Sequence, residues 1–223
     1  MKKLTQEELN AKIEAGDRDF YNLDLTGLNF SGVKIPVEAN FTNSLLIYAN
    51  FKGAELPYPS FYRVNAESAY FAEASIKSAD FTKANLQEAN FTDANLNKAS
   101  FVRTELQGAT FKRANAKEVG FFKSNMKKAN LSYAKFLYSS FDAYSIKQAY
   151  IEGVVFEENS FFFEKHDLDE NPVISNPELK GALKELIKTT GEAVATPPRR
   201  YYINLDSGFI KLDGNFKDCR VYF

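Results

Sequence analysis

The sequence predicts an all-β solenoid: one chain that coils about an axis in short extended sides and carries a cap at each end. Three observations support this fold class. Apolar residues recur every five positions, in 25 consecutive units centred on residues 41 to 161. That period fits neither a helix near 3.6 nor a long strand at 2, and fixed-period self-similarity is typical of stacked repeats. Like residues also recur every twenty positions, which predicts four sides in each coil.

The inward face of each side can be read from the charges. We number a unit from its central apolar residue, position i; residues two apart in a strand share a face, so i and i−2 should both point inward. Neither position is charged in any of the 25 units, whereas i−1, i+1 and i+2 hold every Lys, Arg, Asp and Glu of the array. One column of position i should form an axial aromatic stack: Phe41, Phe61, Phe81, Phe101, Phe121, Phe141 and Phe161.

Units such as Ala84-Asn85-Leu86 and Ala89-Asn90-Phe91 resemble those of the pentapeptide repeat family, over roughly residues 18–163. The resemblance implies a right-handed quadrilateral β-helix, here of about seven coils, and it implies little about function because one fold hosts many functions. Nine asparagines at i−1 are expected to hydrogen-bond the turn backbone. They are Asn40, Asn50, Asn65, Asn85, Asn90, Asn95, Asn115, Asn125 and Asn130.

Residues 1–17 are predicted to be an N-terminal capping helix. Thr5-Gln6-Glu7-Glu8 has the pattern of a capping box, and Gly16 can end a helix over 6–15 in the left-handed conformation. A weaker first coil should follow, with Phe20, Leu25, Phe30 and Ile35 inside. The next apolar centre lies six residues on, at Phe41, which predicts a one-residue bulge near 36–38.

Residues 164–223 are predicted to be a C-terminal cap. Asn176 and Pro177 can start a helix over 177–190 with an apolar face, and short strands at 201–205 and 209–212 would form a small β-hairpin. The apolar helix face should cover the last coil or pair with the same helix of a second copy in a homodimer. The sequence leaves both arrangements open.

Composition argues against several functions. With 28 basic and 29 acidic residues, we expect neither direct nucleic-acid binding nor membrane binding. The one histidine, His166, and the one cysteine, Cys219, make no recognisable zinc site, and no nucleophile elbow or phosphate loop occurs. We therefore expect no enzyme, no cofactor and no metal. There is no signal peptide and no 18-residue apolar run, so the cytoplasm is the expected compartment.

The candidate partner-binding residues share one column. Arg63, Lys83, Arg103 and Lys123 all stand at i+2, beside Tyr62 and Phe122 at i+1. Like charges about 5 Å apart repel, and a purely solubilising surface has no need of a single sign. Asp80 and Glu105 are near enough in the repeat to offset part of this repulsion. The column indicates a docking site for an acidic protein, with a solvated basic surface as the alternative.

The sequence thus predicts a non-enzymatic protein-interaction scaffold whose partner it does not name. The resemblance implies an alternative, because some family members imitate duplex DNA, bind DNA gyrase and protect it from quinolones. Such mimicry needs a strongly negative rod, whereas residues 1–163 hold 19 basic and 19 acidic residues. DNA gyrase is therefore the second of the two partners considered.

Overall fold

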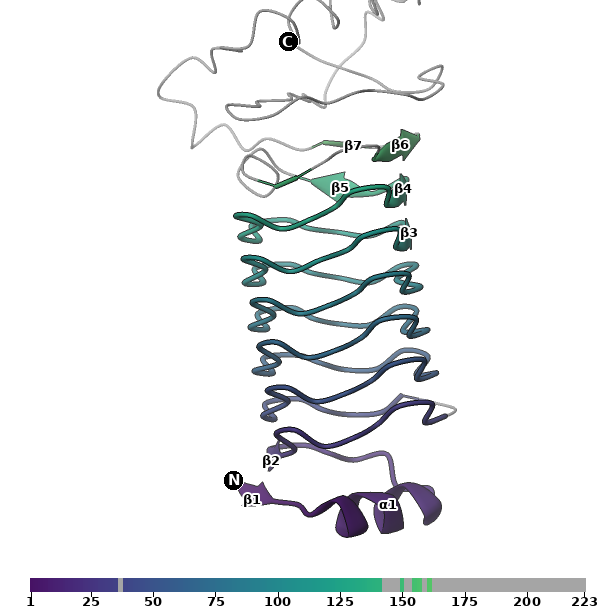
Figure 1. Cartoon of the computed structure of the whole chain (residues 1–223), viewed down its shortest axis with the longest axis vertical. Helices are drawn as coiled ribbons and strands as arrows, with labels where there is room; N and C mark the ends of the chain where they lie inside the picture. Colours follow the sequence, from purple (N-terminus) through teal and green to yellow (C-terminus); the bar gives the residue numbers. More distant parts are fainter. Residues whose placement is uncertain (36–37, 142–148, 151–153, 158–159, 162–223) are drawn as a thin grey trace, which may run out of the picture.

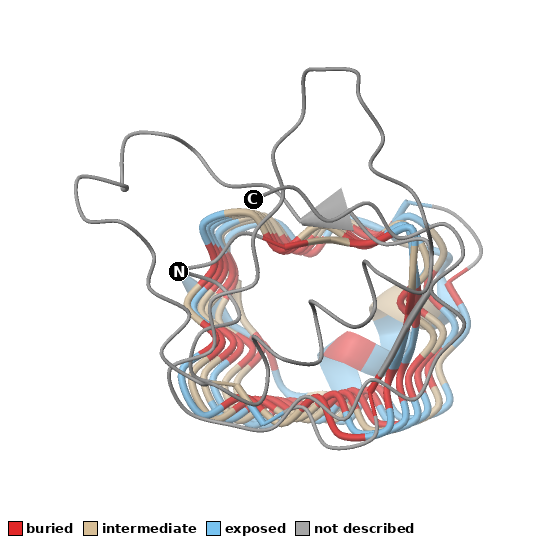
Figure 2. Cartoon of the chain, turned by 90° about the horizontal axis from the view of Figure 1, so that it is seen from above, coloured by how far each residue is buried: buried red, intermediate tan, exposed pale blue. Residues whose placement is uncertain are grey.

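A computed structural model describes residues 1–35, 38–141, 149–150, 154–157 and 160–161 of the chain. The chain rises as a stack of coils above the helix α1, Gln6–Glu14 (Figure 1). Seen from above, the coils superimpose in a four-sided outline with buried residues on its inner side (Figure 2). The predicted β solenoid is confirmed. No helix among the described residues is long and apolar enough to cross a membrane.

The sides of neighbouring coils pair in parallel. Where pairing extends over two or three residues it forms β1 (Lys2–Lys3), β2 (Leu23–Asp24), β3 (Asn115–Lys117), β4 (Lys135–Leu137), β5 (Ser140–Phe141), β6 (Val155–Glu157) and β7 (Ser160–Phe161). The pairs are β1 with β2, β3 with β4, β4 with β6, and β5 with β7. The other sides pair through single bridges, such as Asn65 with Asn85. The twenty-residue repeat is therefore one coil.

The first coil keeps a different register. Its bridges join residues 21 apart, as in Asp19 with Asn40 and Lys34 with Glu55, whereas later bridges join residues 20 apart. This confirms one extra residue after Ile35. Of residues 36–38, where the bulge is predicted, 36–37 lie outside the described part of the chain, and Glu38 has a positive φ of 41°.

The unit around Phe91 satisfies all of its backbone N–H groups. The N–H of Asn90 bonds the coil before, at Ala69 O (2.9 Å). The N–H groups of Phe91 and Asp93 bond the coil after, at Thr110 O (2.7 Å) and Lys112 O (2.9 Å). The N–H of Ala94 closes the corner on Phe91 O (3.0 Å), and that of Thr92 bonds Asn90 Oδ1 (2.8 Å). Buried donors are thus accounted for without long strands.

The asparagines at i−1 act as predicted. Eight of the nine accept a hydrogen bond from the N–H two residues later, as Asn85 Oδ1 does from Gln87 (3.2 Å). Asn115, in β3, is the exception. The N–H of Lys117 is instead satisfied by Asn97 Oδ1 of the coil before, at 2.9 Å.

The corners have a backbone conformation that the sequence analysis did not foresee. Position i+2 lies in the left-handed region throughout the described array, at φ 61° for Lys83 and φ 59° for Asp93, for example. A positive φ at only the third residue of a four-residue turn is the pattern of a type II turn, which normally favours glycine. Non-glycine residues in this region cost roughly 1–3 kcal/mol each and persist where the surroundings hold them. The hydrogen bonds between coils supply that constraint.

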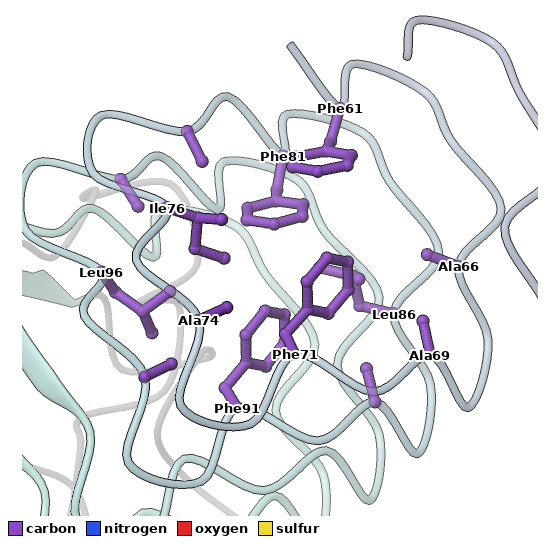
Figure 3. Packing of buried hydrophobic residues seen from close by; sticks show 14 of the residues in the cluster. Phe61, Ala66, Ala69, Phe71, Ala74, Ile76, Phe81, Leu86, Phe91 and Leu96 are labelled. Atoms are coloured by element: carbon purple, nitrogen blue, oxygen red, sulfur yellow. The ribbon is translucent and has the colours of Figure 1, made fainter. Parts of the chain in front are cut away.

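The core contains two aromatic stacks rather than the one predicted. In the predicted stack, Phe41 to Phe141 lie with ring centroids 4.7–5.0 Å apart, and the side chain of Phe161 lies outside the described residues. A second stack runs beside it through Phe30, Phe51, Phe71, Phe91 and Phe111 (Figure 3). The stacks meet edge to face, as Phe91 and Phe101 do at 5.7 Å. Both geometries are favourable for aromatic pairs.

The N-terminal end is closed by side chains and by a short strand. Thr5 and Glu8 form the predicted capping box, and Gly16 has the predicted positive φ of 73°. The Gln6 amide donates to the carbonyl oxygen of Asn29 (3.0 Å) and accepts from its N–H (2.8 Å), as a neighbouring strand would. The pairing of β1 with β2 was not predicted. The predicted C-terminal helix and hairpin lie outside the described residues, and the domain bounds remain predictions.

Candidate functional site

The structure brings the six predicted partner-binding residues to one corner of the solenoid. We call this the basic corner; it comprises residues 62–63, 82–83, 102–103 and 122–123 of four successive coils. Backbone bonds tie the coils together there. The N–H of Arg63 bonds Thr82 O (3.1 Å), that of Lys83 bonds Val102 O (3.0 Å), and that of Arg103 bonds Phe122 O (2.9 Å). The four cations therefore form a continuous row.

The cations are exposed, and the aromatic residues beside them are half-buried. The Arg63 guanidinium and the Lys83 ammonium lie 5.1 and 5.6 Å from the centre of the Tyr62 ring, and Lys83 Nζ donates to Tyr62 Oη at 3.3 Å. Lys123 Nζ lies 5.2 Å from the centre of the Phe122 ring. Cations within about 6 Å of a ring centre are attracted by it. The rings thus offset part of the repulsion that the charges cause.

The nearby carboxylates do not neutralise the row. Asp80 Oδ1 accepts from the N–H of Thr82 (2.9 Å), and Glu105 Oε2 accepts from Gln107 Nε2 (2.9 Å). In the described part of the chain, no carboxylate lies within ion-pair distance of Arg63, Lys83 or Arg103. Their positive field is therefore directed toward solvent.

The corner two sides further along each coil is different. We call it the paired corner; it comprises residues 72–73, 92–93 and 112–113. Arg113 donates to both Asp93 carboxylate oxygens, at 2.8 and 2.5 Å. Glu73 pairs with Lys52 at 3.3 Å. The hydrogen bonds from Arg113 hold the pKa of the Asp93 carboxyl below its ordinary value.

The basic corner combines exposed cations with half-buried aromatic rings. No group of three metal-ligating residues occurs among the described residues. His166 and Cys219 lie outside them. A row of cations with apolar rings at both ends can attract an anionic surface and bury part of it.

Sequence reasoning missed the exposed tyrosines at the other corners. Four stand at i+2, with exposed fractions of 49–66%: Tyr48, Tyr58, Tyr133 and Tyr138. They could have been predicted from the sequence, because position i+2 of the repeat points outward. They are spread over three corners and form no single row.

The geometry defines a solenoid protein whose coils are made of four five-residue sides. A family model described as "Pentapeptide repeat region" matches residues 34–111. A pentapeptide repeat protein from the Arabidopsis thaliana thylakoid lumen is 30% identical, over 55% of this chain and 71% of that one, with a TM-score of 0.35. The chain belongs to the pentapeptide repeat family. No curated protein sequence matches it.

Two further solved structures are similar. A pentapeptide repeat protein, Rfr23, from the cyanobacterium Cyanothece 51142 is 18% identical over 70% of this chain and 99% of that one, with a TM-score of 0.41. Full-length QnrB1, a plasmid-mediated fluoroquinolone resistance protein, is 11% identical over 83% and 94%, also with a TM-score of 0.41. At these identities the likeness concerns the fold alone.

Proposed function

We propose that the chain is a non-enzymatic interaction scaffold that holds an acidic protein partner on its basic corner. One observation supports this above all: exposed cations of one sign follow one another in a hydrogen-bonded column, while the paired corner balances its charges. A bound acidic surface would relieve the repulsion within the row. The repulsion between the four cations, which is unfavourable in the free chain, would then favour binding of the partner.

The two kinds of residue have different roles in the proposed complex. Charge complementarity steers association and suppresses wrong partners more than it adds affinity. Tyr62 and Phe122 would supply apolar contact, since aromatic residues are frequent among those that dominate binding energy. Binding should weaken as salt rises, because exposed charges are screened beyond about 8–10 Å at physiological ionic strength.

Charge reversal tests the proposal. The chain and its R103E/K123E variant are immobilised, and partners captured from the source cell are compared. A matched control, K127E/K128E, makes the same charge change at two exposed lysines of the adjacent corner. We expect R103E/K123E to lose a partner that the control retains, with nearly unchanged melting for both, because exposed charges contribute little to folding. Equal capture by all three proteins would refute the proposal.

The gyrase alternative makes a different prediction. A modulator that imitates duplex DNA should act through acidic surfaces and should not depend on a basic corner. A supercoiling assay with DNA gyrase, with and without the chain, separates the two. An effect on supercoiling that survives in R103E/K123E would replace the proposed function with the alternative.

A second copy of the chain is the other partner that the sequence predicts, through helix 177–190. Sedimentation of the full chain and of a chain ending near Lys165 tests this. A dimer that becomes a monomer on truncation would support the helix as the contact. A monomer in both cases would remove the homodimer from consideration.

A further inference from the structure

From the spacing of the basic corner we infer that the partner presents an α-helix with an acidic stripe. This inference rests on the proposed function and adds the shape of the partner to its charge. A straight row of charges on a rigid backbone selects ligands whose own charges repeat at the same distance.

The repeat distance of the row follows from the core. The rings of Phe61, Phe81, Phe101 and Phe121, which begin the turns that carry the four cations, stack at 4.7, 5.0 and 5.0 Å. The corner backbones are hydrogen-bonded in the same order. The coils superimpose when seen from above, so the row follows the axis (Figure 2). Three steps of about 4.8 Å separate the first cation's backbone from the last, which is about 14 Å.

A helix matches this distance. Residues at i, i+3, i+7 and i+10 form one stripe, and at a rise of 1.5 Å per residue they are about 4.5, 6.0 and 4.5 Å apart along the axis, or about 15 Å in all. Flexible lysine and arginine side chains can absorb a mismatch of this size. Four acidic residues on one stripe would therefore face Arg63, Lys83, Arg103 and Lys123 one to one.

An extended acidic segment does not match. Its same-face side chains are about 6.7 Å apart, so four of them span about 20 Å. A strand laid along the row would move out of register with the cations after the second pair. The spacing therefore favours a helix over an extended peptide of the same charge.

The aromatic residues add a second column to the match. Tyr62, Val102 and Phe122 are half-buried at i+1, next to the cations at i+2. An amphipathic helix presents adjoining stripes of different character, and recognition of such helices relies on apolar anchors at helical spacing. A helix with an apolar stripe beside its acidic one would meet both columns. Tyr62 and Phe122 would contact residues about ten positions apart, since they stand three coils apart.

Three labelled peptides of equal charge and composition test the inference by fluorescence anisotropy with the full chain. The first is an alanine-based helix with Glu at i, i+3, i+7 and i+10 and Leu on the adjoining stripe. The second has the same residues scattered around the helix. The third is prevented from forming a helix by D-amino acids. We expect the striped helix to bind roughly tenfold more tightly than either control, a difference of about 1.4 kcal/mol.

The variants show whether binding occurs at the basic corner. R103E/K123E should remove binding of the striped helix, while K127E/K128E should retain it. If R103E/K123E fails to fold, R103Q/K123Q serves instead and should weaken binding in the same direction. Loss of binding in K127E/K128E as well would mean that net charge alone attracts the peptide, and would overturn the inference.

The outcomes separate the inference from the proposed function. Equal binding of all three peptides would refute the helical partner, as would binding of a short duplex DNA more tightly than the striped helix at equal salt. Failure of every peptide, with capture from the cell still sensitive to R103E/K123E, would refute the helix but keep the basic corner as a binding site. Failure of every peptide, with capture insensitive to the reversal, would refute both.

Discussion

The basic corner and the paired corner share one backbone and differ in side chains. Arg103 and Asp93 both stand at i+2 with positive φ, 56° and 59°, and both N–H groups bond the next coil at 2.9 Å. Yet Arg63, Lys83 and Arg103 of the first have no ion pair among the described residues, whereas Asp93 of the second is held by Arg113. The backbone therefore does not dictate the charge of a corner. In this fold the shape of a corner says little about function, and its charge says more.

The largest effect should come from the core beneath the corners. Phe101→Ala removes a fully buried ring that stacks on Phe81 and Phe121, and should cost about 3–5 kcal/mol of unfolding free energy. Phe111→Ala, in the other stack, should cost a similar amount. Denaturant unfolding measures both. A loss below about 1 kcal/mol for either would contradict the description of one continuous core.

Replacing one i+2 residue by glycine at each corner should distinguish the effect of backbone strain on stability from the effect of charge. Arg103→Gly relieves both the left-handed strain and the repulsion in the row, and should stabilise by about 0.5–1 kcal/mol after the entropy cost of glycine. Arg113→Gly relieves the same strain but breaks the contact with Asp93, so its gain should be smaller or absent. Denaturant midpoints of the two variants test this. Equal gains would mean that neither the repulsion in the row nor the ion pair with Asp93 affects stability.

The smallest expected effect is the loss, at low pH, of the stability that the Asp93 carboxylate contributes. Because the pKa of Asp93 is lowered in the folded chain, its stabilisation is present above the unfolded value, near 3.9, and is lost as pH falls through the folded value. Wild type should therefore be slightly more stable than D93N at pH 7, and the difference should shrink as acid protonates Asp93. Melting temperatures of both proteins over a series of decreasing pH values measure it. A difference that grows on acidification would have the wrong sign.

Much of the fold could be predicted because every unit repeats the same pattern of apolar and polar positions. The inward residues, the aromatic column and the role of the asparagines follow from period and polarity alone. The position of the basic corner followed from the same register, since residues twenty apart must stack. The extra residue after Ile35 was visible as a gap of six between apolar centres.

The left-handed corners could not be predicted from their residues, because Arg, Lys, Glu and Tyr rarely adopt that conformation alone. The hydrogen bonds of neighbouring coils impose it. A signal was present nevertheless: Gly27, Gly32, Gly53 and Gly108 all stand at i+2 with positive φ. The contact of Arg63 and Lys83 with the Tyr62 ring could not be predicted either, because it depends on side-chain conformations rather than on the five-residue repeat.

The closed N-terminal end has a consequence for how such a chain can change in length. Gln6 and β1 satisfy the lower edge of the first coil, so that edge offers little to a further strand. Every interior coil, by contrast, presents the same bonds above and below. A duplicated block of twenty residues inserted in the array would therefore find its partners on both sides and lengthen the row by one step of about 4.8 Å. The array can therefore change in length only by whole coils, counted from the end that α1 closes.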